Sequence, residues 1–294
     1  MNVVLATAPE TWLSKMYLPS LGLLYMAKSL ETAGFPVSVV DSTIEGYQES
    51  QIGALVDAIL AKDPAVVGFT GNSHNRFNVM KAVSLIRAKA PGVVTVVGGP
   101  HFGLSHVAED TMRHTTDIDV VCVGEGEFAL RDLCLAVQEK RDFSGIPGLL
   151  WKDKDRAIVT NKGNRQLPPD DLDLLGMPAW HLIDHSKFHS ILEGGFEGTR
   201  SIGLKSTRGC PYACSFCCEN AAMGRRNVRK RTPALFVDEI EHLMKEYGYN
   251  AFDFWDDTFT VMPQHAYAVC DEIIRRKLDI RWYARTTIFQ PYRD

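Results

Sequence analysis

The chain has 294 residues, of which 45% are hydrophobic and 23% charged, and its formal net charge is −4. This is the composition of a globular protein, and its mild acidity gives no general attraction to nucleic acid. The sequence holds no apolar run long enough to cross a membrane and no export signal after Met1, so we expect a cytoplasmic protein that contacts neither membrane nor nucleic acid.

The first 145 residues alternate short apolar strands with helices. Valine-rich stretches that are apolar on both faces predict buried parallel strands at Val3–Ala6, Val37–Asp41, Ala65–Thr70, Val93–Gly98 and Val120–Val123. Helical stretches follow them at Leu21–Ala33, Ile52–Ala61, Phe77–Ala90, Ser105–Arg113 and Phe128–Glu139. The pattern predicts an α/β domain over residues 1–145 with a flavodoxin-like doubly wound parallel sheet.

The periodicity weakens over residues 146–198, where we expect a linker draped over both domains, with a short hairpin of Leu149–Trp151 and Ala157–Thr160. Strands then resume at Ser201–Ser206, Ala251–Asp256 and Ile280–Thr286, with helices at Pro233–Tyr247 and Pro263–Lys277. Residues 199–294 therefore predict part of a (β/α) barrel. Three strands cannot close a barrel, which leaves open a fragment that binds cofactors without turnover, or a partner that completes the sheet.

Four of the seven cysteines fall within nine residues, at positions 210, 214, 217 and 218. Thiolates select zinc, copper(I) or iron-sulfur clusters, and no second cysteine or histidine pair follows at zinc-site spacing. Cys210, Cys214 and Cys217 are one ligand short of an ordinary [4Fe-4S] electron carrier. This set would leave one iron open to a substrate or cofactor.

The motif Cys210-x3-Cys214-x2-Cys217, with Phe216 in its aromatic position and Arg208-Gly209 before it, resembles that of the radical S-adenosylmethionine (SAM) superfamily. The resemblance implies that the three cysteines hold a [4Fe-4S] cluster whose fourth iron binds SAM. A reductant such as flavodoxin or ferredoxin would drive SAM cleavage to a 5′-deoxyadenosyl radical. Cys218 is outside the motif, and Cys122, Cys134 and Cys270 are expected to be core residues.

Further SAM contacts are expected at the carboxyl ends of the later strands. By the resemblance, Asp256 or Asp257 would meet the methionine ammonium, and Arg285 would pair with the methionine carboxylate. An N-cap aspartate and a surface arginine are the alternative interpretations.

The first domain carries neither a dinucleotide-binding fingerprint nor a P-loop. Its Pro19-Ser20-Leu21-Gly22, Gly98-Gly99-Pro100-His101 and Val123-Gly124-Glu125-Gly126-Glu127 segments resemble the cobalamin-binding domain of cobalamin-dependent radical SAM proteins. The nucleotide tail of cobalamin would thread among these loops. The cobalamin contacts implied by the resemblance are Thr70, Ser73, Gly98, Gly99, Pro100, Gly124, Glu125 and Glu127.

The Asp-x-His-x-x-Gly motif, which supplies a histidine to cobalt in other cobalamin proteins, is absent, so we expect no axial histidine, with His74 and His101 as weak candidates. The resemblance implies a small-molecule substrate and methyl transfer from methylcobalamin to an unactivated carbon or phosphorus. An oxidative cyclisation or rearrangement, as in anaerobic tetrapyrrole cyclases, is the alternative. The methylthiotransferases are disfavoured because they need three further cysteines in the first domain.

Overall fold

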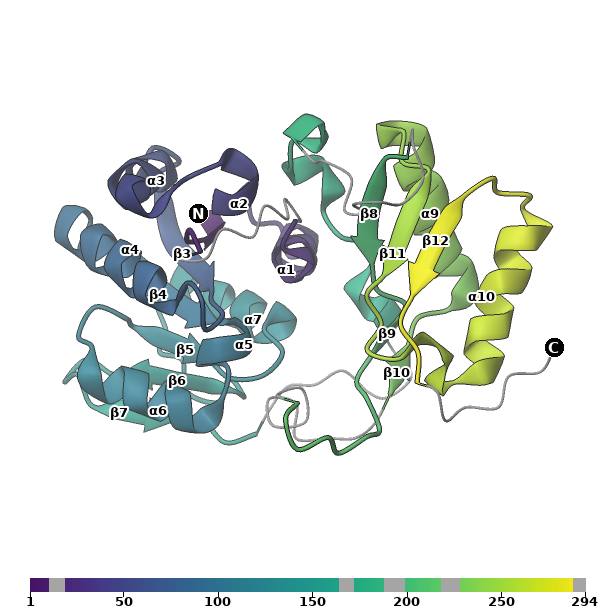
Figure 1. The fold of residues 1–294 in the computed structure, drawn as a ribbon. Coiled ribbons are helices and arrows are strands. Elements are labelled where there is room, and N and C mark those ends of the chain that lie inside the picture. Colours follow the sequence, from purple (N-terminus) through teal and green to yellow (C-terminus); the bar gives the residue numbers. More distant parts are fainter. Residues whose placement is uncertain (11–18, 164–171, 188–198, 218–227, 288–294) are drawn as a thin grey trace. The chain divides into compact units, whose positions relative to one another are not determined.

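The computed structural model describes residues 1–10, 19–163, 172–187, 199–217 and 228–287 (Figure 1). The chain divides into two compact units, one of residues 1–166 with 177–187 and the other of residues 167–176 with 188–294. None of the described helices combines the length and the hydropathy needed to cross a bilayer.

The first unit is built on one sheet with the strand order β2-β1-β3-β4-β5-β6-β7. Its first five strands run parallel. They are β1 (Asn2–Thr7), β2 (Val37–Val40), β3 (Pro64–Thr70), β4 (Val94–Gly98) and β5 (Val120–Cys122). The flavodoxin-like order of these strands confirms the predicted fold class.

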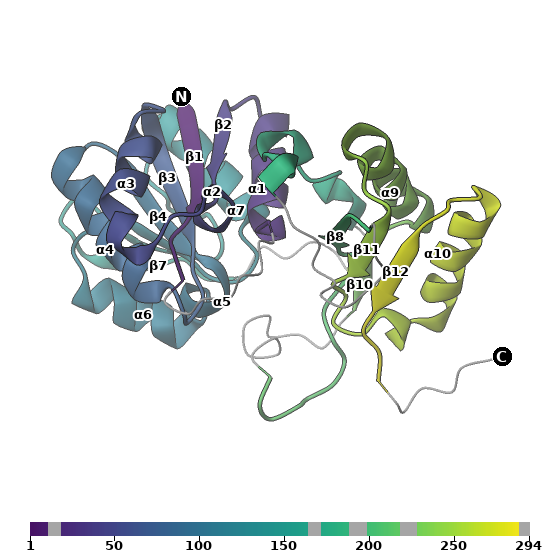
Figure 2. The ribbon, with the colours of Figure 1, turned by 45° about the horizontal axis from the view of Figure 1, so that its top comes forward.

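Helices cover both faces of this sheet (Figures 1 and 2). The longer ones are α1 (Leu21–Thr32), α3 (Ile52–Leu60), α4 (Arg76–Lys89), α6 (Ser105–His114) and α7 (Glu127–Gln138). Leu23 and Leu30 of α1 join Leu133 of α7 in one core. Ile59 of α3 and Val83 of α4 belong to the core on the other face. Each such side chain, fully buried, contributes about 1.5–3 kcal/mol relative to an exposed one.

Short helical turns that the sequence did not predict follow two strands of the first unit. They are α2 (Ser42–Glu45) after β2 and α5 (Gly99–Phe102) after β4, and a 3-10 turn, η1 (Glu49–Gln51), precedes α3. Single helical turns carry too few residues to show a periodic apolar pattern. They matter because both lie at the carboxyl edge of the sheet, where a ligand is expected.

The expected hairpin is present but differs from the expected linker, because it extends the sheet of the first unit. Its strands are β6 (Leu149–Lys152) and β7 (Ile158–Thr160), and β6 pairs antiparallel with β5. Leu149, Leu150 and Trp151 are buried in succession, so both faces of β6 are apolar. A strand of this kind is stable only when both of its faces are covered. Two 3-10 turns, η3 (Trp180–Leu182) and η4 (His185–Lys187), also belong to the first unit.

The second unit contains a three-stranded parallel sheet with the order β12-β11-β8. Its strands are β8 (Ser201–Leu204), β11 (Ala251–Phe254) and β12 (Arg281–Ala284), and its helices are α9 (Pro233–Tyr247) and α10 (Pro263–Arg275). A two-stranded ladder of β9 (Thr207–Arg208) and β10 (Arg229–Lys230) stands apart from the sheet. Two 3-10 turns, η2 (Leu172–Leu175) and η5 (Phe259–Val261), complete the described elements. These are the strands and helices of the predicted partial barrel.

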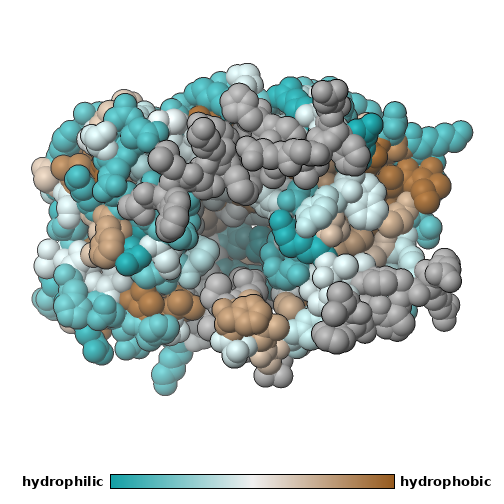
Figure 3. Space-filling view, viewed as in Figure 1, coloured by the Kyte–Doolittle hydropathy of each residue, from teal (hydrophilic) through white to brown (hydrophobic). Residues whose placement is uncertain are grey.

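One face of this second sheet packs on aromatic and aliphatic side chains. Phe254 of β11 lies edge-on to Phe236 of α9 and stacks on Trp282 of β12, with 5.1 Å between the ring centroids in each pair. β12 is at the edge of the sheet, and Trp282 and Tyr283 are 40% and 49% exposed. Figure 3 shows apolar surface on this unit, and Ile274 of α10 is 71% exposed. In the described part of the second unit, the edge strand β12 and the helix α10 thus expose apolar side chains. A strand with neighbours on both sides, and the helix that covers it, would bury such side chains.

Gly99, the first residue after β4, is a position where only glycine fits. Its φ is +89°, and an added Cβ would lie 2.3 Å from the Thr70 hydroxyl and 2.9 Å from the Gly71 nitrogen. We expect Gly99→Ala to lower the free energy of unfolding by about 1–3 kcal/mol, the usual cost of backbone strain and overpacking. Urea unfolding measures this. Gly53→Ala in α3 is the control, since an added Cβ there meets nothing within 4 Å and should be neutral or stabilising. Equal stability of the Gly99→Ala variant and the wild type would contradict the close approach.

Candidate functional site

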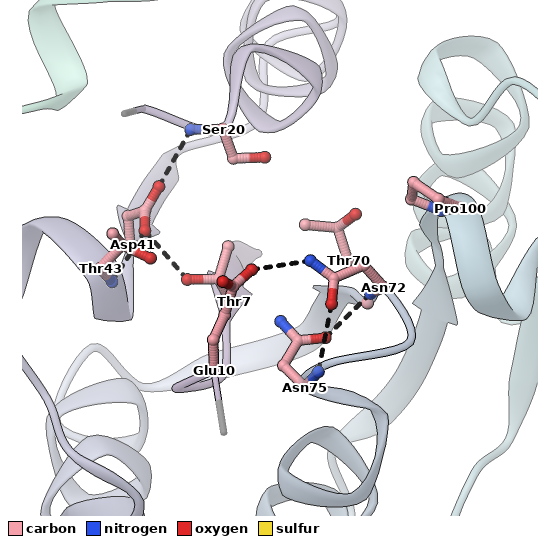
Figure 4. Close-up of a pocket in the computed structure, with 10 residues that line it drawn as sticks. Thr7, Glu10, Ser20, Asp41, Thr43, Thr70, Asn72, Asn75 and Pro100 are labelled. Atoms are coloured by element: carbon pink, nitrogen blue, oxygen red, sulfur yellow. Dashed lines mark hydrogen bonds between the residues drawn. The ribbon is translucent and has the colours of Figure 1, made fainter. Parts of the chain in front are cut away.

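A polar pocket lies at the carboxyl ends of β1, β2 and β3 in the first unit, and its volume is about 230 Å³ (Figure 4). β1 runs between β2 and β3, so this is the point where the strand order reverses and where open parallel sheets bind ligands. The lining residues are Thr7, Glu10, Ser20, Asp41, Thr43, Thr70, Gly71, Asn72, Asn75 and Pro100.

One side of the pocket is organised around the carboxylate of Asp41, which follows β2. It accepts hydrogen bonds from the Thr7 hydroxyl at 3.0 Å and from the Ser20 and Thr43 backbone N–H groups, each at 3.1 Å. Asp41 therefore caps α2 and ties the start of α1 to β1. Burial raises the pKa of Asp41, and these hydrogen bonds act in the opposite direction.

The other side is formed by the turn after β3. The Asn72 and Asn75 side chains each accept a backbone N–H of the other residue, at 3.1 Å and 2.8 Å. The Asn72 amide donates to Glu10 at 2.7 Å, and the buried Asn75 amide donates to the Ala8 carbonyl at 3.1 Å. These bonds fix the loops after β1 and β3, and so preorganise a pocket lined by hydroxyl, amide and carboxylate groups. Such a lining fits a polar part of a ligand.

Of the predicted cobalamin contacts, Thr70 and Pro100 line this pocket. Ser73 is not part of the lining but follows the lining residue Asn72; its hydroxyl lies 3.4 Å from His101 Nδ1, and burial lowers the pKa of His101. The remaining candidates do not belong to the lining in the described part of the chain. They are Gly98, which lies against Cys122 of β5, Gly99, which lies against Thr70 of β3, Gly124 with φ +79°, and the buried Glu125 and Glu127.

Ser20 of the lining lies in the Pro19–Gly22 segment that the sequence analysis named, whereas Glu10 and Asn75 were not predicted. Their common signal is position, because each lies within a few residues of a strand end or helix start at the carboxyl edge. Polar residues at such positions also serve ordinary turns and caps, and so residue type alone does not separate the two roles.

The cysteine motif follows β9 in the second unit. Gly209 has φ +99°, a conformation that favours glycine, and it turns the chain into Cys210, which is half-buried. Cys214 and Cys217 are exposed and joined by a turn in which the Cys217 N–H donates to the Cys214 carbonyl at 3.1 Å. Phe216 is 90% exposed. Cys218 lies outside the described residues.

The thiols of the motif are the donors that the second unit offers to a metal cluster. Among the described residues, no three His, Cys, Asp or Glu side chains are gathered closely enough to hold a single metal ion. The three thiols nevertheless lie within eight residues of one segment, and none of them forms a disulfide in the described part of the chain. A cubane offers each thiol its own iron, so three accessible thiols fit a cluster better than they fit one ion. Cys122 and Cys134 are buried in the first unit, and burial raises the pKa of each of these two thiols to about 12.

The structure places Asp256 and Asp257 differently from one another. Asp256 is fully buried, and its carboxylate accepts hydrogen bonds from Ser206 and Thr207, so it does not face a ligand. The predicted contact of Asp256 with the methionine ammonium therefore finds no support in its surroundings. Asp257 is partly exposed and accepts the Gly209 N–H at 3.2 Å and Lys205 Nζ at 3.4 Å.

Arg285 follows β12, and its guanidinium lies 3.4 Å from Asp253 Oδ2 and 5.7 Å from the centre of the Tyr283 ring. The Arg285 side chain is 50% exposed. It is accessible to an anionic ligand group, although it already has a carboxylate partner. Its contact with a SAM carboxylate stays a prediction.

Comparison with known proteins links both units to one group. The family model described as a B12 binding domain matches residues 13–134. An uncharacterized methyltransferase of Pyrococcus horikoshii is 29% identical over 92% of this chain, and an anaerobic magnesium-protoporphyrin IX monomethyl ester cyclase of Rubrivivax gelatinosus is 27% identical over 94%. The chain spans about half the length of these relatives, 55% and 48% respectively.

Among solved structures, the radical SAM methyltransferase TsrM of Kitasatospora setae, with cobalamin and a [4Fe-4S] cluster bound, has a TM-score of 0.68. It is 22% identical, and the match covers 94% of this chain and 51% of TsrM. The likeness extends over both units and so supports the two-part fold. The B12 binding domain matches most of the first unit, and the three-cysteine motif of the second unit resembles that of the radical SAM superfamily, so the chain is similar to cobalamin-dependent radical SAM proteins.

Proposed function

We propose that this chain is the cofactor-binding part of a cobalamin-dependent radical SAM enzyme that transfers a methyl group to an unactivated centre of a small molecule. One observation carries the proposal. The three-cysteine segment follows the first strand of a parallel, helix-backed sheet, in a chain whose other unit has a polar pocket at the switch point of a B12 binding domain. Residues 1–145 would bind cobalamin and residues 199–294 would hold the cluster.

In the second unit, the thiolates of Cys210, Cys214 and Cys217 would hold three irons of a [4Fe-4S] cluster. The cluster, SAM and cobalamin supply the radical and the methyl group when bound, because protein side chains do not provide this chemistry. The chain itself binds and orients these groups. Asp257 and Arg285 are the partly exposed residues at the strand ends that could orient an ammonium and a carboxylate.

In the first unit, the pocket would hold a polar portion of cobalamin. The hydroxyls of Thr7, Thr70 and Thr43 and the amides of Asn72 and Asn75 can donate to or accept from a nucleotide tail. His101 has a lowered pKa and is therefore a neutral imidazole at pH 7, but its Nδ1 already faces Ser73. We propose that neither His101 nor His74 ligates cobalt.

The second candidate reaction is an oxidative cyclisation or rearrangement, which the similarity to the Rubrivivax gelatinosus cyclase favours. Both reactions need an electron donor such as flavodoxin or ferredoxin, and we propose a cytoplasmic enzyme. They differ in the fate of the SAM methyl group.

The proposed activity is tested with the chain loaded with iron, sulfide and hydroxocobalamin under a chemical reductant. SAM labelled in its methyl group should give 5′-deoxyadenosine, measured by chromatography, and should transfer label to the bound cobalamin. Formation of 5′-deoxyadenosine without label on cobalamin would favour the cyclase-like alternative. If neither product forms, this chain binds cofactors without turnover.

Replacing any one of Cys210, Cys214 and Cys217 by alanine should abolish stable cluster binding, because two thiols cannot hold the cube against loss of iron. Iron and sulfide per chain after anaerobic reconstitution measure this. Cys270→Ala is the matched control, since Cys270 is a half-buried thiol on α10, outside the motif. Iron content that is unchanged in a motif variant, or lost equally in the control, would contradict the assignment.

Thr70→Val should weaken hydroxocobalamin binding by about 3- to 10-fold, since it removes one hydroxyl from the pocket at nearly constant volume and one hydrogen bond contributes about 0.5–1.5 kcal/mol. Absorbance titration gives the affinity. Thr111→Val on α6 removes a buried hydroxyl that does not line the pocket and should leave the affinity unchanged. Electron paramagnetic resonance of the reduced, bound cobalamin should show no nitrogen splitting from imidazole. Such splitting, or unchanged affinity of Thr70→Val, would overturn this placement.

A further inference from the structure

A short arm of residues 205–209 connects β8 to Cys210, and the turn after β11 holds it through Asp256. Asp256 Oδ1 accepts the Ser206 hydroxyl at 2.8 Å and also the Thr207 hydroxyl, while Asp256 Oδ2 accepts the Ser206 backbone N–H at 3.2 Å. Asp256 and Ser206 are completely buried, and Thr207 is 1% exposed. Both oxygens of a desolvated carboxylate are thus used on two adjacent residues of the arm.

A buried histidine extends this network to α10. Nε2 of His265 lies 3.1 Å from the Ser206 hydroxyl. Because the single proton of that hydroxyl is directed to Asp256, the imidazole must donate through Nε2. Burial lowers the pKa of His265 to about 4, which keeps the ring neutral at pH 7. His265, Ser206 and Asp256 therefore form one chain of hydrogen bonds that joins three elements of the second unit.

The rest of the arm is held by backbone and surface contacts. The Ser206 carbonyl accepts the Arg231 N–H at 2.9 Å, and Thr207 and Arg208 pair with Lys230 and Arg229 in the β9–β10 ladder. At the outer end, Asp257 accepts the Gly209 N–H directly before Cys210. Of these contacts, the one with Asp256 is the most deeply buried, and it is the only carboxylate contact among the described residues that holds both Ser206 and Thr207.

We propose that Asp256 is a positioning residue of the cluster site, which fixes the arm so that Cys210 meets the iron together with Cys214 and Cys217. This assigns Asp256 a role different from binding the SAM ammonium. The inference rests on the proposed cluster at these cysteines. Hydrogen-bond partners that orient metal ligands typically change metal affinity by about 10- to 100-fold when removed, even though they do not touch the metal.

The test compares cluster retention in variants of the full chain after anaerobic reconstitution. Asp256→Asn keeps the shape of the side chain but turns a donor toward groups that are themselves donors, and it should lower cluster retention in a chelator competition by about 10- to 100-fold. Thr207→Val, which removes only the hydroxyl, should lose cluster in the same direction. Thr207→Ser, which keeps the hydroxyl, should retain the cluster at the wild-type level.

Val269→Ala in α10 controls for general destabilisation, because Val269 is fully buried in the second unit and is remote in sequence from the arm. It should lower the melting temperature without lowering cluster retention. Wild-type retention in both Asp256→Asn and Thr207→Val, or an equal loss in Val269→Ala and Thr207→Ser, would overturn the positioning role. If Asp256→Asn does not fold, the comparison of Thr207→Val with Thr207→Ser decides. A wild-type chain that binds no cluster would instead refute the proposed function.

Discussion

Parallel strands deliver all of their outgoing connections to one edge of a sheet, and both units of this chain depend on that constraint. In the first unit it brings the loops after β1, β2 and β3 together around one polar pocket. In the second unit it brings the turn after β11 against the arm after β8. Residues more than thirty positions apart in sequence become neighbours in each case. The candidate sites arise from this geometry more than from any single motif.

The two units also share a way of holding that edge together. Asp41 follows β2, Asp256 follows β11, and each is a buried carboxylate that accepts hydroxyl and backbone N–H groups from a neighbouring loop. Burying a charge without partners is costly, whereas a carboxylate surrounded by donors orders those donors strongly. Each aspartate is therefore stable in its buried position only while the adjacent loop supplies these donors. The loop, in turn, keeps its conformation because the buried aspartate binds it. A pocket wall depends on Asp41, and the arm of the cysteine segment depends on Asp256.

Much of this fold could be predicted from the sequence, because strands such as Ala65–Thr70 and helices such as Pro233–Tyr247 carry strong apolar periodicity and clear breakers. The place of the hairpin Leu149–Thr160 could not, since two short strands give no signal of the sheet edge that they join. The different surroundings of Asp256 and Asp257 likewise could not be predicted from the sequence. Adjacent residues of one type share composition and position, and only packing shows that one is buried against Ser206 while the other is partly exposed.

The small ladder of β9 and β10 has a consequence for how the cysteine segment can vary. It pairs residues 207–208 with residues 229–230, and thereby closes a loop that contains the whole motif. The entropy of closing such a loop grows only with the logarithm of its length, so that each doubling costs about 0.6 kcal/mol. Residues added after Cys217 and before β10 would thus change the free energy of the fold little and would leave the entry to Cys210 in place.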